Sequence, residues 1–373
     1  MYSVFQHWDP LKVCVIGTSY PPEFYRWIQD ANTRQRFEQL AAETEQDYQA
    51  LISLLQDRFG IRVLRPQLPV DLSQLKKHGQ WLAPPVCPRD YFLMIHNQLW
   101  VPQIPNRAYA DRAFAKQTAL SRQDFDRIDL VEHLEKLKFY QNIFQHVVDQ
   151  GNTVCPTQLD VISGCFVSRI GRDLYFATQS YEQDQGQLLA EVNQLFPNTR
   201  NRVVNAGGHG DATYCAVAPG LIISLRDVPT YADTFPGWEV VYLPPSDYAD
   251  SAEFRHSMKL NRGRWNIPGF EQDTNLVHLV DHYFDSWVGN ASETVFDVNI
   301  LVIDSKNIIV SSHSDIVESA CARHGIEVHV SPFRHRYFWD AGIHCVTNDL
   351  DREGTVKNYF ADCDNKYTAE SLT

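Results

Sequence analysis

The feature that most constrains the fold is an order of elements that recurs along the chain, although the residues themselves barely repeat. In the first unit, apolar residues recur at helical spacing from Phe37 to Phe59, Gly60 follows where a helix commonly ends, and the apolar run "IRVL" comes next. This pattern predicts a helix, a glycine turn and a buried strand. A recurring unit of this size is typical of repeat architectures.

The same order returns four more times, and hairpins are predicted between the units. The further units are Val131 to Gln150 before Gly151 and "TVC", Leu188 to Phe196 before "RVVN", a short element ending in Gly237 before "WEVVYL", and Ile316 to His324 before Gly325 and "IEVHV". Four apolar pairs predict β-hairpins: "YFLMI" with "QLWVP", "FVSRI" with "DLYFAT", "TYCAVA" with "LIISL", and "VNILVI" with "IIVSS".

Five helix-strand units with four hairpins leave one hairpin missing. It could form if "HCVTND" near the C-terminus paired with "LKVCVIG" near the N-terminus, which would close the units into a ring. The sequence therefore predicts an α/β fold in which residues 1–373 form a single domain, a closed ring of five pseudosymmetric units. A conventional α/β sandwich is the alternative.

Composition and charge narrow the class of function. Hydrophobic residues make up 44% and charged residues 21% of the 373 residues, and no run reaches eighteen apolar residues, so no membrane span is expected. The first residues lack the features of a secretion signal, and the eight cysteines are scattered without a CxxC pair, so we expect a cytoplasmic protein without a disulfide framework. The formal charge of −13 argues against nucleic-acid binding and favours a small-molecule partner, with cationic molecules among the candidates.

Polar and nucleophilic residues occur where each predicted strand meets its hairpin. If the units are equivalent, these junctions lie at one end of the ring and their side chains converge on one cavity. The junction residues are Asp90, Cys165, His209, Asp211, Asp297 and Cys345.

This set of side chains suits covalent catalysis on a cationic carbon. Carboxylates accept paired hydrogen bonds from a planar guanidinium, so Asp90 and Asp211 could hold one between them. Cys345 would be the nucleophile, activated as a thiolate by the bound cation and a nearby imidazolium. His209 would transfer protons to the departing amine and from the incoming nucleophile.

Each residue taken singly also has an ordinary structural interpretation. His209 lies in a glycine-rich turn, Asp211 could be a turn or cap residue, and Asp90 follows Arg89 and could pair with it. Cys345 could be an inert thiol of the core. It is the combination at corresponding positions that favours a functional site.

A metal site is the rival interpretation of the same residue types. His209, His335, His344 and Cys345 could supply ligands, but no pair has the close spacing that is typical of zinc sites. Neither a metal nor another cofactor is therefore predicted.

Three segments together resemble a known family. They are "CPRD" at 87–90, "HGDATYCAVAPGLIISL" at 209–225 and "GIHCVTNDLDREG" at 342–354, in an order and spacing similar to those of the amidinotransferases, relatives of glycine amidinotransferase in the guanidino-group-modifying superfamily. The resemblance implies a five-bladed pseudosymmetric α/β-propeller of the pentein kind, which agrees with the repeat count.

The resemblance also implies a reaction and roles for residues. Cys345 would attack the guanidinium carbon of L-arginine or a similar donor, forming an amidino-cysteine and releasing ornithine, and a primary amine would then accept the amidino group. His209 matches the general acid and base, Asp90 and Asp211 match guanidinium-binding carboxylates, and Arg226 is placed for a substrate carboxylate.

Two positions depart from the family pattern. An Asp that orients the catalytic histidine is expected near Cys165, where this chain has "SGCFVSRIGRD", so either Asp160 substitutes for it, or the histidine is held otherwise, or catalysis is impaired. Asp297 stands where a small hydroxyl residue is expected, and its carboxylate could bind the amino group of donor or acceptor.

Two alternatives to the amidinotransferase interpretation stay open. A hydrolase of the same superfamily would use water in place of the amine and give citrulline, and a catalytically silent member would bind a guanidino compound or a protein partner. Acceptor specificity is expected in loops such as Pro244 to Trp265, where Arg262 and Arg264 could contact an acidic acceptor or be solvated surface. A homodimer is expected by analogy only.

Overall fold

The computed structural model describes residues 1–77, 79–106, 121–178, 185–206, 209–225, 231–243, 273–284, 287 and 297–360. The helices in this part are α1 (Ala31–Ser53), α3 (Arg122–Leu137), α4 (Gln141–Asp149), α5 (Gln185–Leu195), α6 (Tyr231–Thr234), α8 (Thr274–Tyr283), α9 (Asp315–Arg323) and α10 (Arg336–Trp339). None of the described helices is long and apolar enough to cross a membrane.

The described strands form five three-stranded sheets with one common plan. The sheets are β17 (Thr347–Arg352), β1 (Leu11–Ile16) and β2 (Arg62–Leu64); β5 (Leu93–Ile95), β6 (Gln98–Pro102) and β7 (Thr153–Thr157); β8 (Val167–Ile170), β9 (Asp173–Thr178) and β10 (Arg200–Asn205); β11 (Tyr214–Ala218), β12 (Leu221–Ser224) and β13 (Glu239–Tyr242); and β14 (Leu301–Asp304), β15 (Asn307–Val310) and β16 (Glu327–Val330). In each sheet an antiparallel pair is followed by a strand parallel to the middle one. A separate small sheet pairs β3 (Lys76–Lys77) with β4 (Gln80–Trp81).

The helix-glycine-strand units of the sequence are the crossover connections of these sheets. A parallel pair needs such a crossover, and helices α1, α5, α6 and α9 each lie between the middle and the third strand of a sheet, as do α3 and α4 together. The backbone at Gly60, Gly151, Gly237 and Gly325 has φ between 66° and 86°, which favours glycine after a helix. All four predicted hairpins are confirmed.

One predicted helix is wrong in its continuity. The segment from Val131 to Gln150 is interrupted, because α3 ends at Leu137 and a 3-10 turn over Lys138–Tyr140 precedes α4. Phe139 and Tyr140, both in the 3-10 turn, are buried.

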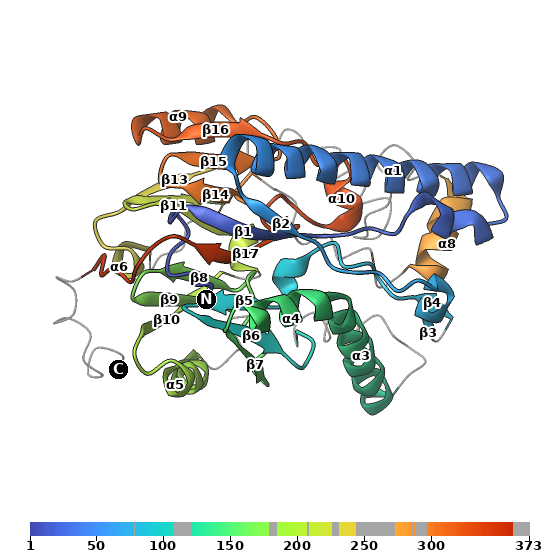
Figure 1. Cartoon of the computed structure of the whole chain (residues 1–373), viewed down its shortest axis with the longest axis horizontal. Helices are drawn as coiled ribbons and strands as arrows, with labels where there is room; N and C mark the ends of the chain where they lie inside the picture. The colour runs from blue at the N-terminus through green and yellow to red at the C-terminus, as the bar shows by residue number, and fades with distance from the viewer. Residues whose placement is uncertain are drawn as a thin grey trace.

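The first and last of the described strands, β1 and β17, pair with each other, as predicted. β1 runs antiparallel to β17, with Cys14 opposite Asp349 and Ile16 opposite Thr347. Figure 1 shows these two strands side by side in the middle of the molecule, with α1, α3, α5 and α9 around the outside. In the described part of the chain the sheets are not joined edge to edge into one closed sheet.

Candidate active site

The candidate nucleophile lies in a buried turn directly before β17. We call residues 342–346, between α10 and β17, the cysteine turn. Cys345 is 2% exposed, and its sulfur accepts a hydrogen bond from Asn299 Nδ2 at 3.0 Å. The cysteine turn therefore places the thiol of Cys345 almost completely out of contact with solvent.

The side chain of Asn299 holds the cysteine turn through hydrogen bonds and links it to Asp211. Its Oδ1 accepts the backbone N–H groups of His344 at 2.8 Å and Cys345 at 3.0 Å, and its Nδ2 also donates to the carbonyl of Asp211 at 3.3 Å. A Cβ atom added at Gly342 would lie 2.4 Å from Asn299 Oδ1, so only glycine leaves room for the amide. We refer to these contacts of Asn299 as the amide clamp.

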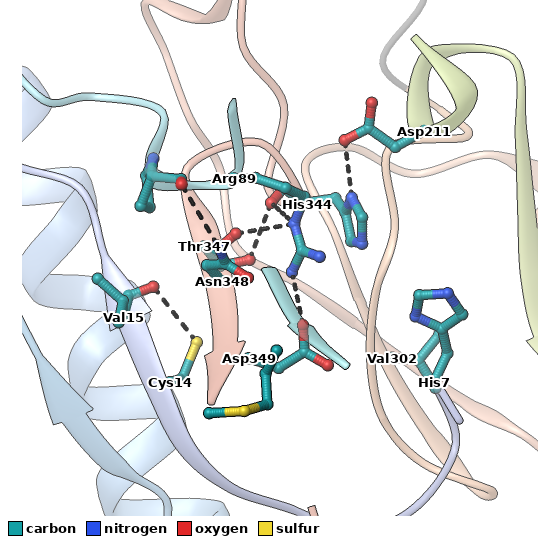
Figure 2. Close-up of polar contacts among 12 residues, drawn as sticks. His7, Cys14, Val15, Arg89, Asp211, Val302, His344, Thr347, Asn348 and Asp349 are labelled. Atoms are coloured by element: carbon teal, nitrogen blue, oxygen red, sulfur yellow. Dashed lines mark hydrogen bonds and ion pairs between the residues drawn. The ribbon is translucent and has the colours of Figure 1, made fainter. Parts of the chain in front are cut away.

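Asp211 joins the cysteine turn to the loop that carries His209. Its Oδ2 lies 2.8 Å from His344 Nδ1 and 3.5 Å from the sulfur of Cys345. Figure 2 shows the ring of His344 pointing at this carboxylate. Burial and then Arg89 hold the pKa of His344 well below 6.5, so the contact is a hydrogen bond from a neutral imidazole rather than an ion pair.

His209 lies at the start of the 3-10 turn Gly210–Ala212 that contains Asp211, and it is 6% exposed. Ligand atoms of His209, Cys165 and Asp90 lie within 4.8 Å of one another. The pKa of Cys165 is raised to about 12, because burial and the carboxylates outweigh the nearby, hydrogen-bonding His209. Cys165 is thus a neutral thiol beside the candidate acid and base.

A buried ionic network packs behind the cysteine turn. Arg89 Nε donates to the carbonyls of His344 and Thr347 at 2.8 Å and 2.9 Å, and its Nη2 lies 3.3 Å from Asp349 (Figure 2). Asp349 also accepts from Arg169 at 2.7 Å. These contacts hold the backbone on both sides of Cys345.

Charge decides the protonation states in this network. Arg352 donates to Asp349 at 2.7 Å, so three arginines surround this one carboxylate. Although burial raises the pKa of Asp349, Arg169, Arg352 and Arg89 hold it well below 3.8. Burial lowers the pKa of Arg169 to about 10, which still leaves it charged at neutral pH.

A buried cavity connects the network with the candidate site. Its lining includes His7, Cys165, Asp211, His344 and Arg352. Burial of the His7 ring lowers its pKa well below 6.5, and the positive charge of Arg169 adds to this effect. His7 therefore adds no positive charge to the arginines around it at neutral pH.

The structure shows the contacts of several residues for which the sequence left alternatives open. Cys165 lies beside His209, and Asp160 lies in the turn after β7, so whether Asp160 helps to hold the histidine stays a prediction. Arg89 forms an ion pair with Asp349, whereas the sequence suggested Asp90 as a partner. His335 donates to or accepts from Glu43 on α1 at 2.7 Å, so the rival metal set of His209, His335, His344 and Cys345 is not assembled as one cluster among the described residues.

Of the other residues predicted for the site, Asp297 lies within the described part of the chain and Arg226 lies outside it. Asp297 is half-buried at the approach to β14 and accepts a hydrogen bond from Ser312 at 3.2 Å. Arg226 and the acceptor segment from Pro244 to Trp265, with Arg262 and Arg264, lie outside the described residues.

Sequence reasoning missed the amide clamp and the ionic network. Asn299 is a single amide within the apolar run "VNILVI", and a polar residue in such a run is a signal for a buried hydrogen-bonding role. Arg169 gives a similar signal within "FVSRI". Both signals indicate a buried polar side chain, but neither shows which residue that side chain bonds to.

Comparison with known proteins gives related sequences across nearly the whole chain. The mitochondrial glycine amidinotransferase of Xenopus tropicalis is 22% identical over 413 residues, which cover 96% of this chain and 84% of that protein. The L-arginine:L-lysine amidinotransferase of Pseudomonas savastanoi pv. phaseolicola is 23% identical over 152 residues, 40% of this chain and 32% of that protein. No family model matches the chain.

Solved structures show the same fold. An amidinotransferase of a saxitoxin biosynthetic pathway from Microseira wollei superposes with a TM-score of 0.62 at 16% identity, covering 96% of this chain and 99% of that one. The inosamine-phosphate amidinotransferase of Streptomyces griseus also gives a TM-score of 0.62, at 17% identity and the same coverage. These likenesses show an α/β fold shared over almost the full length.

Proposed function

This chain belongs to the amidinotransferase family of the pentein superfamily and is a transferase, and from that premise we propose the reaction that it catalyses. It moves the amidino group of L-arginine to a primary amine through an amidino-cysteine at Cys345 and releases ornithine. Arginine as donor is supported by the relative that is named an L-arginine:L-lysine amidinotransferase.

The observation that carries the proposal is the place of the buried sulfur beside a carboxylate. Asp211 Oδ2 lies 3.5 Å from Cys345 Sγ. A carboxylate is the natural partner of a guanidinium, so a guanidinium bound at Asp211 has its central carbon within reach of the sulfur. The bound cation in turn favours the thiolate that attacks it.

Two further contacts support an anionic sulfur at Cys345. Asn299 Nδ2 donates to the sulfur, and hydrogen bonds strengthen when the acceptor carries charge. Behind the turn, three arginines share the single carboxylate of Asp349, which leaves excess positive charge in a region of low dielectric.

The proposed chemistry balances in two steps. The thiolate forms a bond to the guanidinium carbon, and the bond from that carbon to the departing nitrogen breaks as His209 gives this nitrogen a proton. The acceptor amine then forms its own bond to the carbon and returns a proton to His209, while the carbon–sulfur bond breaks. Asp90, whose carboxylate is in the cluster with His209, binds the guanidinium together with Asp211 and also places a negative charge near His209.

The remaining parts of the proposal extend beyond the described contacts. Asp297 binds an amino group of donor or acceptor, and Arg226 binds a substrate carboxylate. We also propose that the five sheets are the blades of a five-bladed propeller and that residues 1–373 form one amidinotransferase-like domain. A cytoplasmic location and a homodimer stay predictions.

The experiment is intact-protein mass spectrometry after brief incubation with L-arginine, with ornithine and citrulline assayed in the supernatant. The wild type is expected to gain the mass of one amidino group and to release ornithine. Cys345→Ser is expected to gain nothing. Cys321→Ser is the matched control, because Cys321 is equally buried but lies on α9.

Each result separates the proposal from its alternatives. An adduct that also forms on Cys345→Ser contradicts the assignment of the nucleophile. Citrulline in place of ornithine indicates the hydrolase. Arginine binding measured by calorimetry, with neither adduct nor product, indicates the silent member of the fold.

A further inference from the structure

Three residues that the chain brings together from distant segments form a donor set for a soft metal ion. Asp90 comes from the 3-10 turn Pro88–Asp90, Cys165 from the turn before β8, and His209 from the loop before β11. One oxygen, one sulfur and one nitrogen of these side chains lie within 4.8 Å of one another. Thiolate, imidazole and carboxylate are the ligands that zinc takes in proteins.

The backbone around these three residues is held by hydrogen bonds between the segments that carry them. Gly164 N donates to the Arg89 carbonyl at 2.8 Å, and Asp211 N donates to the Cys165 carbonyl at 3.2 Å. The ring of Phe166 meets the ring of His209 edge-on with centroids 4.8 Å apart. The backbone segments that carry the three side chains are therefore joined to one another.

The charges at this place also favour a divalent cation. The charge of a divalent ion bound here would be neutralised by one thiolate and one carboxylate. The proposed transfer reaction uses Cys345, and not Cys165, as its nucleophile.

We propose that Asp90, Cys165 and His209 bind Zn²⁺ or a similar thiol-seeking divalent ion, and that the bound ion inhibits the enzyme. Three protein ligands leave one position of a tetrahedral ion open to water or substrate. A metal on His209 removes the nitrogen lone pair that carries protons, and a metal on Asp90 competes with the guanidinium. The inhibition rests on the proposed amidino transfer, whereas the binding does not.

Cobalt(II) is the probe for the binding, since a cobalt–thiolate bond gives a charge-transfer band in the near ultraviolet. The reduced wild-type protein is expected to give this band with saturation at one equivalent. Cys165→Ser should lose the band and bind cobalt at least about 100-fold more weakly, more than the loss of an outer contact would cause. Asp90→Asn should also weaken binding while it keeps the thiol.

Cys345→Ser is the matched control, because it removes the other thiol near Asp211 and is expected to keep the band. The proposal is overturned if no saturable band forms, if Cys165→Ser keeps it, or if Cys345→Ser loses it. Thermal unfolding of each variant without metal shows that the comparison is made on folded protein.

The inhibition has its own readout. Zn²⁺ is expected to stop ornithine release in the wild type, and a chelator to restore it. If cobalt binds as described but no ornithine is ever formed, the metal site stands and the proposed function fails. If ornithine forms but cobalt does not bind, the reverse holds.

Discussion

The replacement of Asn299 by Asp tests how the buried sulfur of Cys345 is activated. The new side chain keeps an oxygen where the two backbone N–H groups donate, and it exchanges the nitrogen 3.0 Å from the sulfur for an oxygen that cannot donate when ionised. A hydrogen bond to a charged group contributes about 1.5–3 kcal/mol. At about 1.4 kcal/mol for each factor of ten, we expect the thiolate population at pH 7 to fall roughly 10- to 150-fold.

The assay is the rate at which iodoacetamide alkylates Cys345 at pH 7, followed by peptide mass spectrometry so that the eight cysteines are distinguished. Asn152→Asp is the matched control. Asn152 is a buried amide that accepts from the backbone of Tyr2 at 2.9 Å and donates to Asn97 at 2.8 Å. Equal alkylation rates for Asn299→Asp and the wild type, with both proteins folded, would refute the role of the amide clamp.

Three further predictions concern the surroundings of the cysteine turn. Gly342→Ala should cost about 1–3 kcal/mol of unfolding free energy by overpacking and should slow alkylation of the nucleophile, because its Cβ enters the amide clamp. Gly325→Ala is the control, because Gly325 has φ 68° but its added Cβ would meet no atom within 4 Å. It should lower the unfolding free energy by about 1 kcal/mol without slowing the alkylation of Cys345. Equal alkylation rates for Gly342→Ala and Gly325→Ala would count against the amide clamp. The lowered pKa of buried His7 means that its contribution to stability is present above about pH 6.5 and is lost as pH falls, by about 1.3 kcal/mol between pH 7 and 5.5. Urea unfolding should show a smaller loss for His7→Gln and an unchanged loss for His313→Gln, an exposed control. Arg89→Met should lower the unfolding free energy by about 3 kcal/mol, because it breaks a buried ion pair and frees two carbonyls of the backbone that holds the nucleophile, and a loss below about 1 kcal/mol contradicts this.

Much of the fold could be predicted because its repeating unit is local. Helical spacing, a glycine such as Gly60 and a short apolar run occur within about thirty residues, so the pattern is visible without any tertiary contact. The pairing of β1 with β17 could also be predicted, since every other unit had its hairpin. The break in the helix at Lys138–Tyr140 could not, because it depends on which neighbours the two aromatic rings meet.

The site could be predicted only as a set of residues, without their contacts. The junction rule selected Cys345, Asp211 and His209, and the structure links the first two directly. The amide clamp could not be predicted, because Asn299 reaches its partners across more than forty residues of sequence. The same is true of Arg169 and its carboxylate, which are 180 residues apart.

The pairing of β1 with β17 also sets the order of events during synthesis. Ribosomes add roughly 5–20 residues each second, and domains fold as their parts emerge. Cys345 lies just before β17, and among the described strands β17 pairs within its sheet only with β1, the first strand made. A nascent chain therefore carries the strands of the four other three-stranded sheets before it can hold the sulfur of Cys345 in place. The candidate site is completed only when β17 emerges, so we expect a chain that stops before β17 to lack it.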